Sequence, residues 1–270
     1  MRNALPVIVI LALGIALLTS CETVPITGRT QLSLVPAATV NSMGLDYYRD
    51  FMGKHKVTAD VGGSESVRRV GTRIQQAVTR YFQQQGDLSR LEGYRWEFNL
   101  IEDPSINAFA LPGGKVVVYT GILPVTRHDA GLAVVMGHEI AHILANHGAE
   151  RMSQGLLAQM GGVALSEALA TRPGQTRDLF LGAFGIGTQV GVLLPFSRLQ
   201  ESEADHLGLI FMAMAGYDPR EAVPFWIRMS AAKQKTGGTP EFLSTHPTDA
   251  NRIENIRRLI PQALPYYRRN

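Results

Sequence analysis

The sequence is poor in cysteine: Cys21 is the only one among 270 residues. The chain beyond it therefore has no disulfide and no thiolate ligand for a metal. It also has no block of basic residues and no platform of alternating aromatic and basic residues. Because the formal net charge is only +3, we predict no nucleic-acid partner. With 45% hydrophobic and 18% charged residues, the chain can build a core, and its length suits one large domain or two small ones.

The N-terminus lacks the run of about 20 apolar residues that a membrane-spanning helix needs. Residues 5–18 form a shorter apolar stretch that follows Arg2 and ends in Leu18-Thr19-Ser20-Cys21. A basic start, a short apolar run and small residues before the cut are typical of a secretory signal peptide. The last four residues are similar to a lipobox, which implies cleavage before Cys21 and lipidation of that residue. The alternative is an ordinary signal peptide followed by an incidental cysteine.

These features predict three segments. Residues 1–20 are expected to be a lipoprotein signal peptide, residues 21–38 a lipidated polar tether, and residues 39–270 one folded domain. By resemblance to lipoprotein sorting rules, Glu22 after the cysteine favours the outer membrane. The predicted location is therefore the bacterial cell envelope, with the chain lipid-anchored to the outer membrane and facing the periplasm.

The pattern of the domain predicts helices around a small sheet. Apolar residues recur at helical spacing over 39–52 and 64–82. Residues 94–101 alternate between apolar and polar, as in a strand, and two further strands over 107–111 and 115–120 flank a Pro-Gly-Gly turn. The second half of the chain is almost entirely helical in pattern. This order predicts an α+β fold, predominantly helical, with a small antiparallel β-sheet.

The segment His138-Glu139-Ile140-Ala141-His142 carries the clearest chemical signal. On a helix, His138 and His142 lie one turn apart on the same face, where two imidazoles can bind one Zn²⁺ at about 2.0–2.1 Å each. Glu139 projects at a different angle and can reach the water on the metal rather than the metal itself. We predict that it acts as the general base and then as the proton donor to the leaving amine.

A site of this kind needs a third protein ligand, and the sequence offers a second acidic cluster. Glu201 and Asp205 are four residues apart, so both carboxylates share one face of a helix. We predict Glu201 as the zinc ligand and Asp205 as the acceptor of the free N–H of a zinc-binding histidine. Glu203 is the alternative ligand if the register differs. His147 lies about 140° around the helix from the second motif histidine and is not expected to bind the metal.

Together these residues resemble the gluzincin metallopeptidases, a family typified by the heat-shock protease HtpX, the prenyl-protein endopeptidases, BepA and LoiP. The soluble, lipoprotein LoiP-like branch is the most similar. The resemblance implies a minimal gluzincin fold with the small sheet beside the active-site helix, and one catalytic Zn²⁺ per chain. It covers most of the predicted domain and is carried by four stretches: 107–121, 138–142, 201–205 and Thr245-His246-Pro247 with Arg252.

The resemblance also suggests roles for residues outside the motif. The strand with Asn107, Ala108, Phe109 and Ala110 is expected to pair with an extended peptide substrate. His246 is expected to approach the zinc as a catalytic residue, either stabilising the oxyanion or occupying the open coordination site at rest.

Two further interpretations concern the second half of the chain. Arg252 is predicted to neutralise a carboxylate near the zinc. The apolar, glycine-rich segment 155–196, split by residues 172–178, has three interpretations: buried helices, a mobile lid or a membrane-dipping hairpin. We favour buried helices with a lid-like connection.

The predicted function is zinc-dependent endopeptidase activity on misfolded or unassembled cell-envelope polypeptides, in envelope quality control. One alternative is a chaperone or assembly factor for outer-membrane proteins in which cleavage is minor or latent. A second is a purely structural zinc site, which would need a fourth protein ligand; His246 is the candidate. The sequence predicts no oligomeric state.

Overall fold

The computed structural model describes residues 21–160, 165–185, 197–235, 239–247 and 251–267. The predicted signal peptide, residues 1–20, lies outside the described residues, as do residues 161–164 and 186–196 of the apolar segment. Within the described ranges, no helix is both long enough and apolar enough to cross a membrane.

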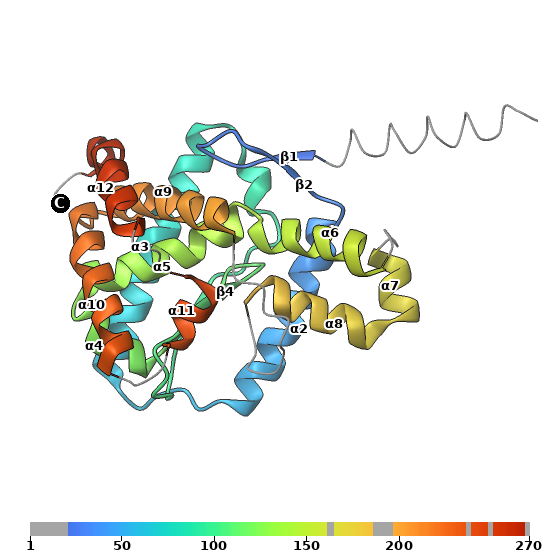
Figure 1. Cartoon of the computed structure of the whole chain (residues 1–270), viewed down its shortest axis with the longest axis horizontal. Coiled ribbons are helices and arrows are strands. Elements are labelled where there is room, and N and C mark those ends of the chain that lie inside the picture. The colour runs from blue at the N-terminus through green and yellow to red at the C-terminus, as the bar shows by residue number, and fades with distance from the viewer. Residues whose placement is uncertain (1–20, 161–164, 186–196, 236–238, 248–250, 268–270) are drawn as a thin grey trace, which may run out of the picture.

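Helices make up most of the described chain, with short 3-10 turns between some of them (Figure 1). The helices are α2 (Ala37–Lys54), α3 (Val61–Gln84), α4 (Leu123–Thr126), α5 (Asp129–Leu144), α6 (His147–Met160), α7 (Leu165–Thr171), α8 (Pro173–Ala183), α9 (Arg198–Met214), α10 (Ala222–Lys235), α11 (Glu241–Thr245) and α12 (Arg252–Ala263). The strands are β1 (Cys21–Thr23), β2 (Thr30–Leu32), β3 (Glu97–Ile101), β4 (Ala108–Leu111) and β5 (Lys115–Tyr119). The predicted α+β, predominantly helical fold is confirmed.

The three-stranded sheet has the order β3-β5-β4 and differs from the prediction in one respect. Strands β4 and β5 form the predicted hairpin, in which Gly113 and Gly114 take φ values of +81° and +82° that favour glycine. Strand β3, however, pairs with β5 in the parallel direction, so the sheet is mixed rather than antiparallel. Alternation of side chains along residues 94–101 defines a strand but carries no information about its direction.

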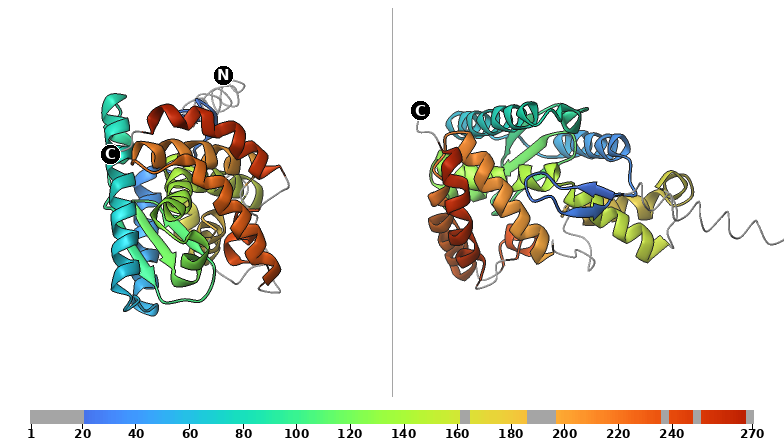
Figure 2. Two further views of the ribbon diagram at one scale, coloured as in Figure 1. Left: turned by 90° about the vertical axis from the view of Figure 1, so that its left-hand side faces the viewer. Right: turned by 90° about the horizontal axis from the view of Figure 1, so that it is seen from above.

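The sheet separates two hydrophobic clusters because side chains alternate between its faces. On β5, Val116 and Val118 belong to a cluster with α3, α5 and α9, whereas Val117 and Tyr119 belong to one with α2, α6 and α8. Figure 2 shows α3 running along one side of the sheet, where it packs on β3 and α5. The sheet is therefore buried on both faces, as its entirely buried central strand β5 requires.

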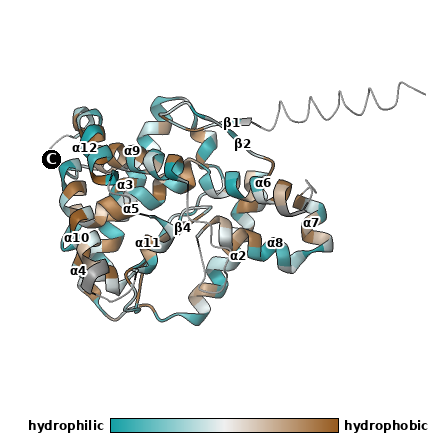
Figure 3. Cartoon of the chain, viewed as in Figure 1, coloured by the Kyte–Doolittle hydropathy of each residue, from teal (hydrophilic) through white to brown (hydrophobic). Residues whose placement is uncertain are grey.

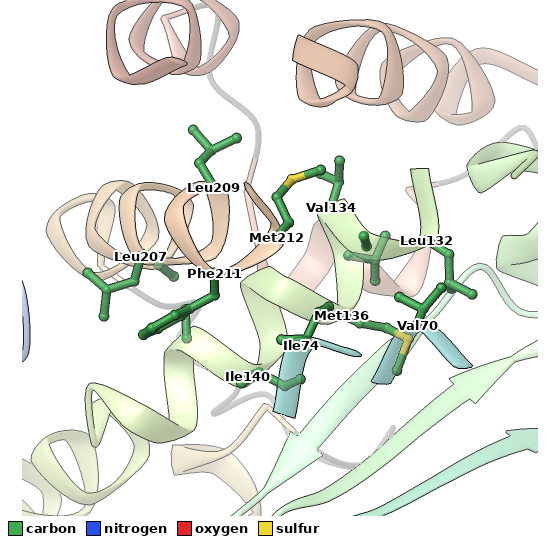
Figure 4. Packing of buried hydrophobic residues seen from close by; sticks show 14 of the residues in the cluster. Val70, Ile74, Leu132, Val134, Met136, Ile140, Leu207, Leu209, Phe211 and Met212 are labelled. Atoms are coloured by element: carbon green, nitrogen blue, oxygen red, sulfur yellow. The ribbon is translucent and has the colours of Figure 1, made fainter. Parts of the chain in front are cut away.

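Helices α5 and α9 cross at the centre of the molecule and pack closely against each other. Figure 4 shows the apolar side chains that surround this crossing, which come from α3, α5 and α9. Farther from the centre, α8 is amphipathic: in Figure 3 it shows both hydrophilic and hydrophobic residues along its length. Its Leu179 and Phe180 are buried while Arg177 is exposed.

Two segments differ from their predicted form. Residues 172–178 were predicted as a connection, but Pro173 begins α8, so most of this segment is helical. The predicted tether, residues 21–38, contains the antiparallel β1–β2 hairpin and the start of α2. Val24 and Gln31 in it are buried, at 1% and 4% exposure. The hairpin is therefore packed on the domain, because its apolar side chain and several of its polar side chains contact partners there.

Candidate metal centre and active site

Helices α5 and α9 begin with caps that set their register. The side chain of His128 accepts a hydrogen bond from Gly131 N at the start of α5. At the start of α9, Ser197 and Gln200 form a capping box. Glu201 follows in the first turn of α9, where the helix dipole favours a carboxylate.

Four buried side chains converge between these helices: His138 and His142 from α5, Glu201 from α9, and His246 at the end of α11. One ligand atom from each lies within 4.8 Å of all the others. The Nε2 atoms of His138 and His142 are 3.0 Å apart, and Nδ1 of His246 is 3.2 Å from His138 Nε2. Glu201 Oε1 lies 2.9 Å from His246 Nδ1 and 3.3 Å from His142 Nε2.

These spacings suit a zinc ion. Ligands at about 2.0–2.1 Å from Zn²⁺ in a tetrahedron are about 3.3 Å from one another, close to the separations in this cluster. The donor set of imidazole nitrogens and one carboxylate is also typical of zinc sites. The predicted ligands His138, His142 and Glu201 thus come together, and the register of α9 selects Glu201 rather than Glu203.

Asp205 and Arg252 lie behind the ligands, in the places where the sequence predicted their carboxylate and guanidinium. Asp205 Oδ1 is 3.0 Å from His138 Nδ1, so it can accept the proton that leaves Nε2 free for a metal. Arg252 donates to both Asp205 oxygens at 2.8 and 2.9 Å and to Glu201 Oε2 at 2.6 Å. Its guanidinium also stacks 3.6 Å from the centre of the Trp226 ring. One buried cation therefore compensates two buried carboxylates.

The sequence interpretation missed a second chain of contacts, which begins at His147. Nδ1 of His147 is 2.9 Å from Nδ1 of His142, and its Nε2 is 3.0 Å from Glu203 Oε2. The helical-angle argument assumed one continuous helix, but Asn146 at φ +54° ends that continuity and α6 starts in a new direction. His147 is indeed outside the metal cluster. Two residues in the sequence could have indicated this chain of contacts: His147, which lies at the helix break, and Glu203, the additional carboxylate on α9.

Glu139 lies beside the ligands without joining them. Its Oε1 is 3.3 Å from His246 Nε2, and among the described residues this buried oxygen has no hydrogen-bond partner. The same carboxylate faces the backbone N–H of Ala110 on β4, which opposes the rise in its pKa that burial causes. A buried carboxylate oxygen that faces the ligand cluster is placed to take a proton from a water bound there.

The predicted substrate strand is an edge of the sheet next to this carboxylate. Because Tyr119 N donates to Asn107 O, the backbone groups of Asn107 and Phe109 hydrogen-bond to β5. The backbone N–H and C=O groups of Ala108 and Ala110 point away from β5. The outward N–H of Ala108 donates to the Asn107 side chain at 2.9 Å, and that of Ala110 faces Glu139. A peptide would therefore pair with the outward carbonyls or displace the bond between Ala108 and Asn107, and peptide binding at β4 stays a prediction.

The electrostatics agree with a metal centre. Burial lowers the pKa of His142 well below its usual value, which keeps the imidazole neutral as a ligand must be. Burial alone would raise the pKa of Glu201, but His246 and Arg252 outweigh it and hold this pKa well below its usual value. Burial raises the pKa of Glu139, an effect that His246 and His138 reduce. Glu201 is thus held ionised, as a metal-binding carboxylate must be, and burial makes the Glu139 carboxylate bind a proton more readily than an exposed one.

The fold, the zinc-binding cluster and the adjacent base define a zinc metalloendopeptidase. The chain belongs to peptidase family M48, whose family model matches residues 30–260. Over 250 residues it is 36% identical to the mitochondrial metalloendopeptidase OMA1 of Schizosaccharomyces pombe, a match covering 93% of this chain and 69% of the relative.

More distant relatives belong to other organisms. The human metalloendopeptidase OMA1 is 32% identical over 91% of this chain and 47% of its own length. The beta-barrel assembly-enhancing protease of Escherichia coli K12 is 27% identical over 91% of this chain and 49% of its own length. The chain thus spans about half the length of these two relatives.

The comparisons confirm the predicted family but give no support to the LoiP-like branch. They also correct the predicted location. The bacterial outer membrane, facing the periplasm, was predicted from the N-terminal motif, but the OMA1 relatives are mitochondrial by name and more similar in sequence than the beta-barrel assembly-enhancing proteases. A short motif before one cysteine is weaker evidence than similarity over most of the chain.

Proposed function

We propose that this zinc metalloendopeptidase cleaves extended segments of unfolded or misassembled polypeptides. The observation that carries the proposal is the packing of α5, the helix that bears Glu139, against the edge strand β4. An extended peptide along this edge would present successive peptide bonds to the base. Main-chain pairing is tolerant of sequence but requires an unfolded segment.

The roles of the residues follow from their positions. His138, His142 and Glu201 would hold the zinc, which when bound polarises the peptide carbonyl and makes water a better nucleophile near neutral pH. Glu139 takes the proton from the attacking water and delivers it to the departing amine nitrogen. Asp205 holds the His138 ring in the tautomer that leaves Nε2 free, and its distance of 3.0 Å supports this role.

His246 has two possible roles that the geometry supports. Its Nδ1 stands where a fourth ligand would stand, and its Nε2 faces Glu139 at 3.3 Å. An imidazole in this place either blocks the open coordination position of the zinc at rest or stabilises the oxyanion during attack by water. Cleavage by His246→Ala distinguishes them: a faster rate supports blocking, and a slower rate with unchanged zinc content supports oxyanion stabilisation.

The test of the proposed function compares the wild type with Glu139→Gln on an unfolded protein such as casein. We expect equal zinc content and a loss of cleavage of at least about 100-fold, because the amide is isosteric but cannot accept the proton. Unchanged cleavage would contradict the mechanism. If the variant lost cleavage but still suppressed aggregation of unfolded proteins as well as the wild type, the chaperone alternative would gain support.

Attachment to a membrane through a lipid on Cys21 is part of the proposal and rests on the sequence motif. Cys21 begins strand β1 of the packed hairpin. The mass of the mature N-terminal peptide and the partition of wild type and Cys21→Ser into a detergent phase test it. An unmodified Cys21 would end this part of the proposal and leave the peptidase assignment unaffected.

A further inference from the structure

We propose that the β1–β2 hairpin is part of the zinc site, acting through Arg29, Glu203 and His147 as positioning residues for the ligand His142. This inference rests on the zinc site of the proposed function. It assigns a role in metal binding to a segment that lies more than 100 residues before the ligands in the sequence.

The contacts fix one arrangement of protons. Because His142 Nε2 faces the ligand cluster, its proton is on Nδ1, which donates to His147 Nδ1 at 2.9 Å. The proton of His147 is then on Nε2 and is donated to Glu203 Oε2 at 3.0 Å. Glu203 accepts in this arrangement. Each bond determines the next, so the carboxylate fixes the ring orientation of a zinc ligand through a second imidazole.

Arg29 keeps that carboxylate in place. Its Nε donates to Glu203 Oε2 at 2.8 Å, and its Nη1 donates to Glu150 Oε1 at 2.8 Å. Thr27 of the same hairpin also donates to Glu203. The side chains of Glu203 and His147 are 3% and 0% exposed. Two buried carboxylates that share one guanidinium would repel each other if it were removed, so Glu203 would move away from His147.

A separate contact ties the hairpin to the ligand helix. Gln31 accepts from Arg29 Nη2 at 2.9 Å and donates to the carbonyl of Ala145 at 2.7 Å. Ala145 caps the C-terminus of α5, the helix that carries His142. The hairpin therefore contacts the C-terminal end of α5 directly, through Gln31. It reaches Nδ1 of His142 indirectly, through Glu203 and His147.

The hairpin offers a matched control, since a second arginine holds its other end. Arg90 donates to Glu22 Oε1 at 3.1 Å and to the carbonyl of Thr23 at 2.7 Å. Its side chain is 24% exposed, against 19% for Arg29. Within the described residues Arg90 makes no direct contact with Arg29, Glu203 or His147, and the bond of its partner Glu22 to Asn146 Nδ2 at 2.7 Å stays in place in Arg90→Gln. Loss of Arg90 thus loosens the hairpin while Arg29, Glu203 and His147 keep their own hydrogen bonds.

The experiment measures zinc affinity of the full chain by competition with a chelator for the wild type, Arg29→Gln, His147→Phe, Glu203→Gln and Arg90→Gln. We expect a 10- to 100-fold weaker affinity for the first three variants and a change below about threefold for Arg90→Gln. The visible absorption of the Co²⁺-loaded proteins should change in the first three and stay the same in Arg90→Gln. Thermal unfolding of the metal-free proteins reports whether each variant folds.

The coupling is tested by combining Arg29→Gln with His147→Phe. We expect the double variant to lose little more affinity than His147→Phe alone, because both changes break one chain. Additive losses, equal losses in Arg29→Gln and Arg90→Gln, or wild-type affinity in Arg29→Gln would overturn the inference. If His147→Phe does not fold, His147→Asn replaces it. A wild type that binds no zinc would instead overturn the proposed function, so the two failures are distinguishable.

Discussion

Gly137 on α5 and Gly208 on α9 lie in direct contact where the two ligand-bearing helices cross. A Cβ added to Gly208 would lie 2.9 Å from the backbone nitrogen of His138, and one added to Gly137 would lie 3.0 Å from the carbonyl oxygen of Gly208. Both neighbours are backbone atoms and cannot rotate away. The absence of two side chains therefore allows the approach that brings Glu201 to the histidines of α5.

We expect Gly208→Ala to push α9 away from α5. The overpacking should destabilise the protein by about 1–3 kcal/mol, and the displaced Glu201 should weaken zinc binding at least about tenfold. Denaturant unfolding and chelator competition measure the two effects. The control is Gly53→Ala, also in a helix, because an added Cβ there meets nothing within 4 Å. Equal behaviour of the two variants would show that the helix crossing tolerates a methyl group.

Arg252→Gln should leave Asp205 and Glu201 buried without their common cation. We expect the metal-free protein to lose about 3–5 kcal/mol of stability, as is typical for breaking a buried ion pair. The zinc-loaded protein should lose less, because the bound cation compensates Glu201 itself. Unfolding curves with and without a chelator measure this difference.

The matched change is Arg220→Gln, which breaks the exposed pair with Asp218, where the arginine is 63% exposed. We expect no measurable change in stability in either form of the protein, because water screens this pair. The explanation for Arg252 would be wrong if its loss cost the same with and without zinc.

Glu97→Gln tests a pH effect away from the metal centre. Glu97 accepts from the buried Lys115 at 2.7 Å and from Tyr48 at 3.0 Å. Burial alone would raise its pKa, but these bonds outweigh it and lower the pKa below its usual value. A lowered carboxyl pKa stabilises the folded state above the unfolded-state pKa of about 4.5, and this stabilisation disappears as the pH falls through the folded-state value.

Glu97→Gln should therefore cost about 1 kcal/mol at pH 7, a modest amount because its side chain is 51% exposed and screened by water. The difference from the wild type should shrink as the pH falls below about 4.5. Urea unfolding of the metal-free proteins at several pH values measures it. A difference that stayed constant down to the acid limit would exclude the carboxylate charge as its cause.

Several features were predictable from the sequence because they depend on neighbours along the chain. Helical spacing places His138 and His142 on one face whatever the rest of the fold does. The same spacing rule places Glu201 and Asp205 on one face of their helix. The two glycines between β4 and β5 predicted their hairpin. Each of these expectations needed only residues that are close together in the sequence.

Other features depend on where separate elements meet, and no spacing rule reports them. The parallel pairing of β3 with β5 is one example, since a strand pattern has no direction. The folding of residues 21–38 onto the domain is another, because a polar segment is a tether or a buried network depending on its partners. Arg29 is an example: it lies in a polar segment of the sequence, and only the fold places Glu150 and Glu203 beside it.

By itself, the sequence determined the residue types and their local placement: two imidazoles one turn apart on a helix face, a carboxylate next to the first of them, and two carboxylates on one face of a later helix. Only the tertiary structure decided which carboxylate faces the imidazoles, that His246 joins them, and that His147 connects them to the hairpin. These outcomes depend on the crossing of α5 and α9 and on the break at Asn146, where backbone contacts between distant segments set positions that residue spacing cannot contain.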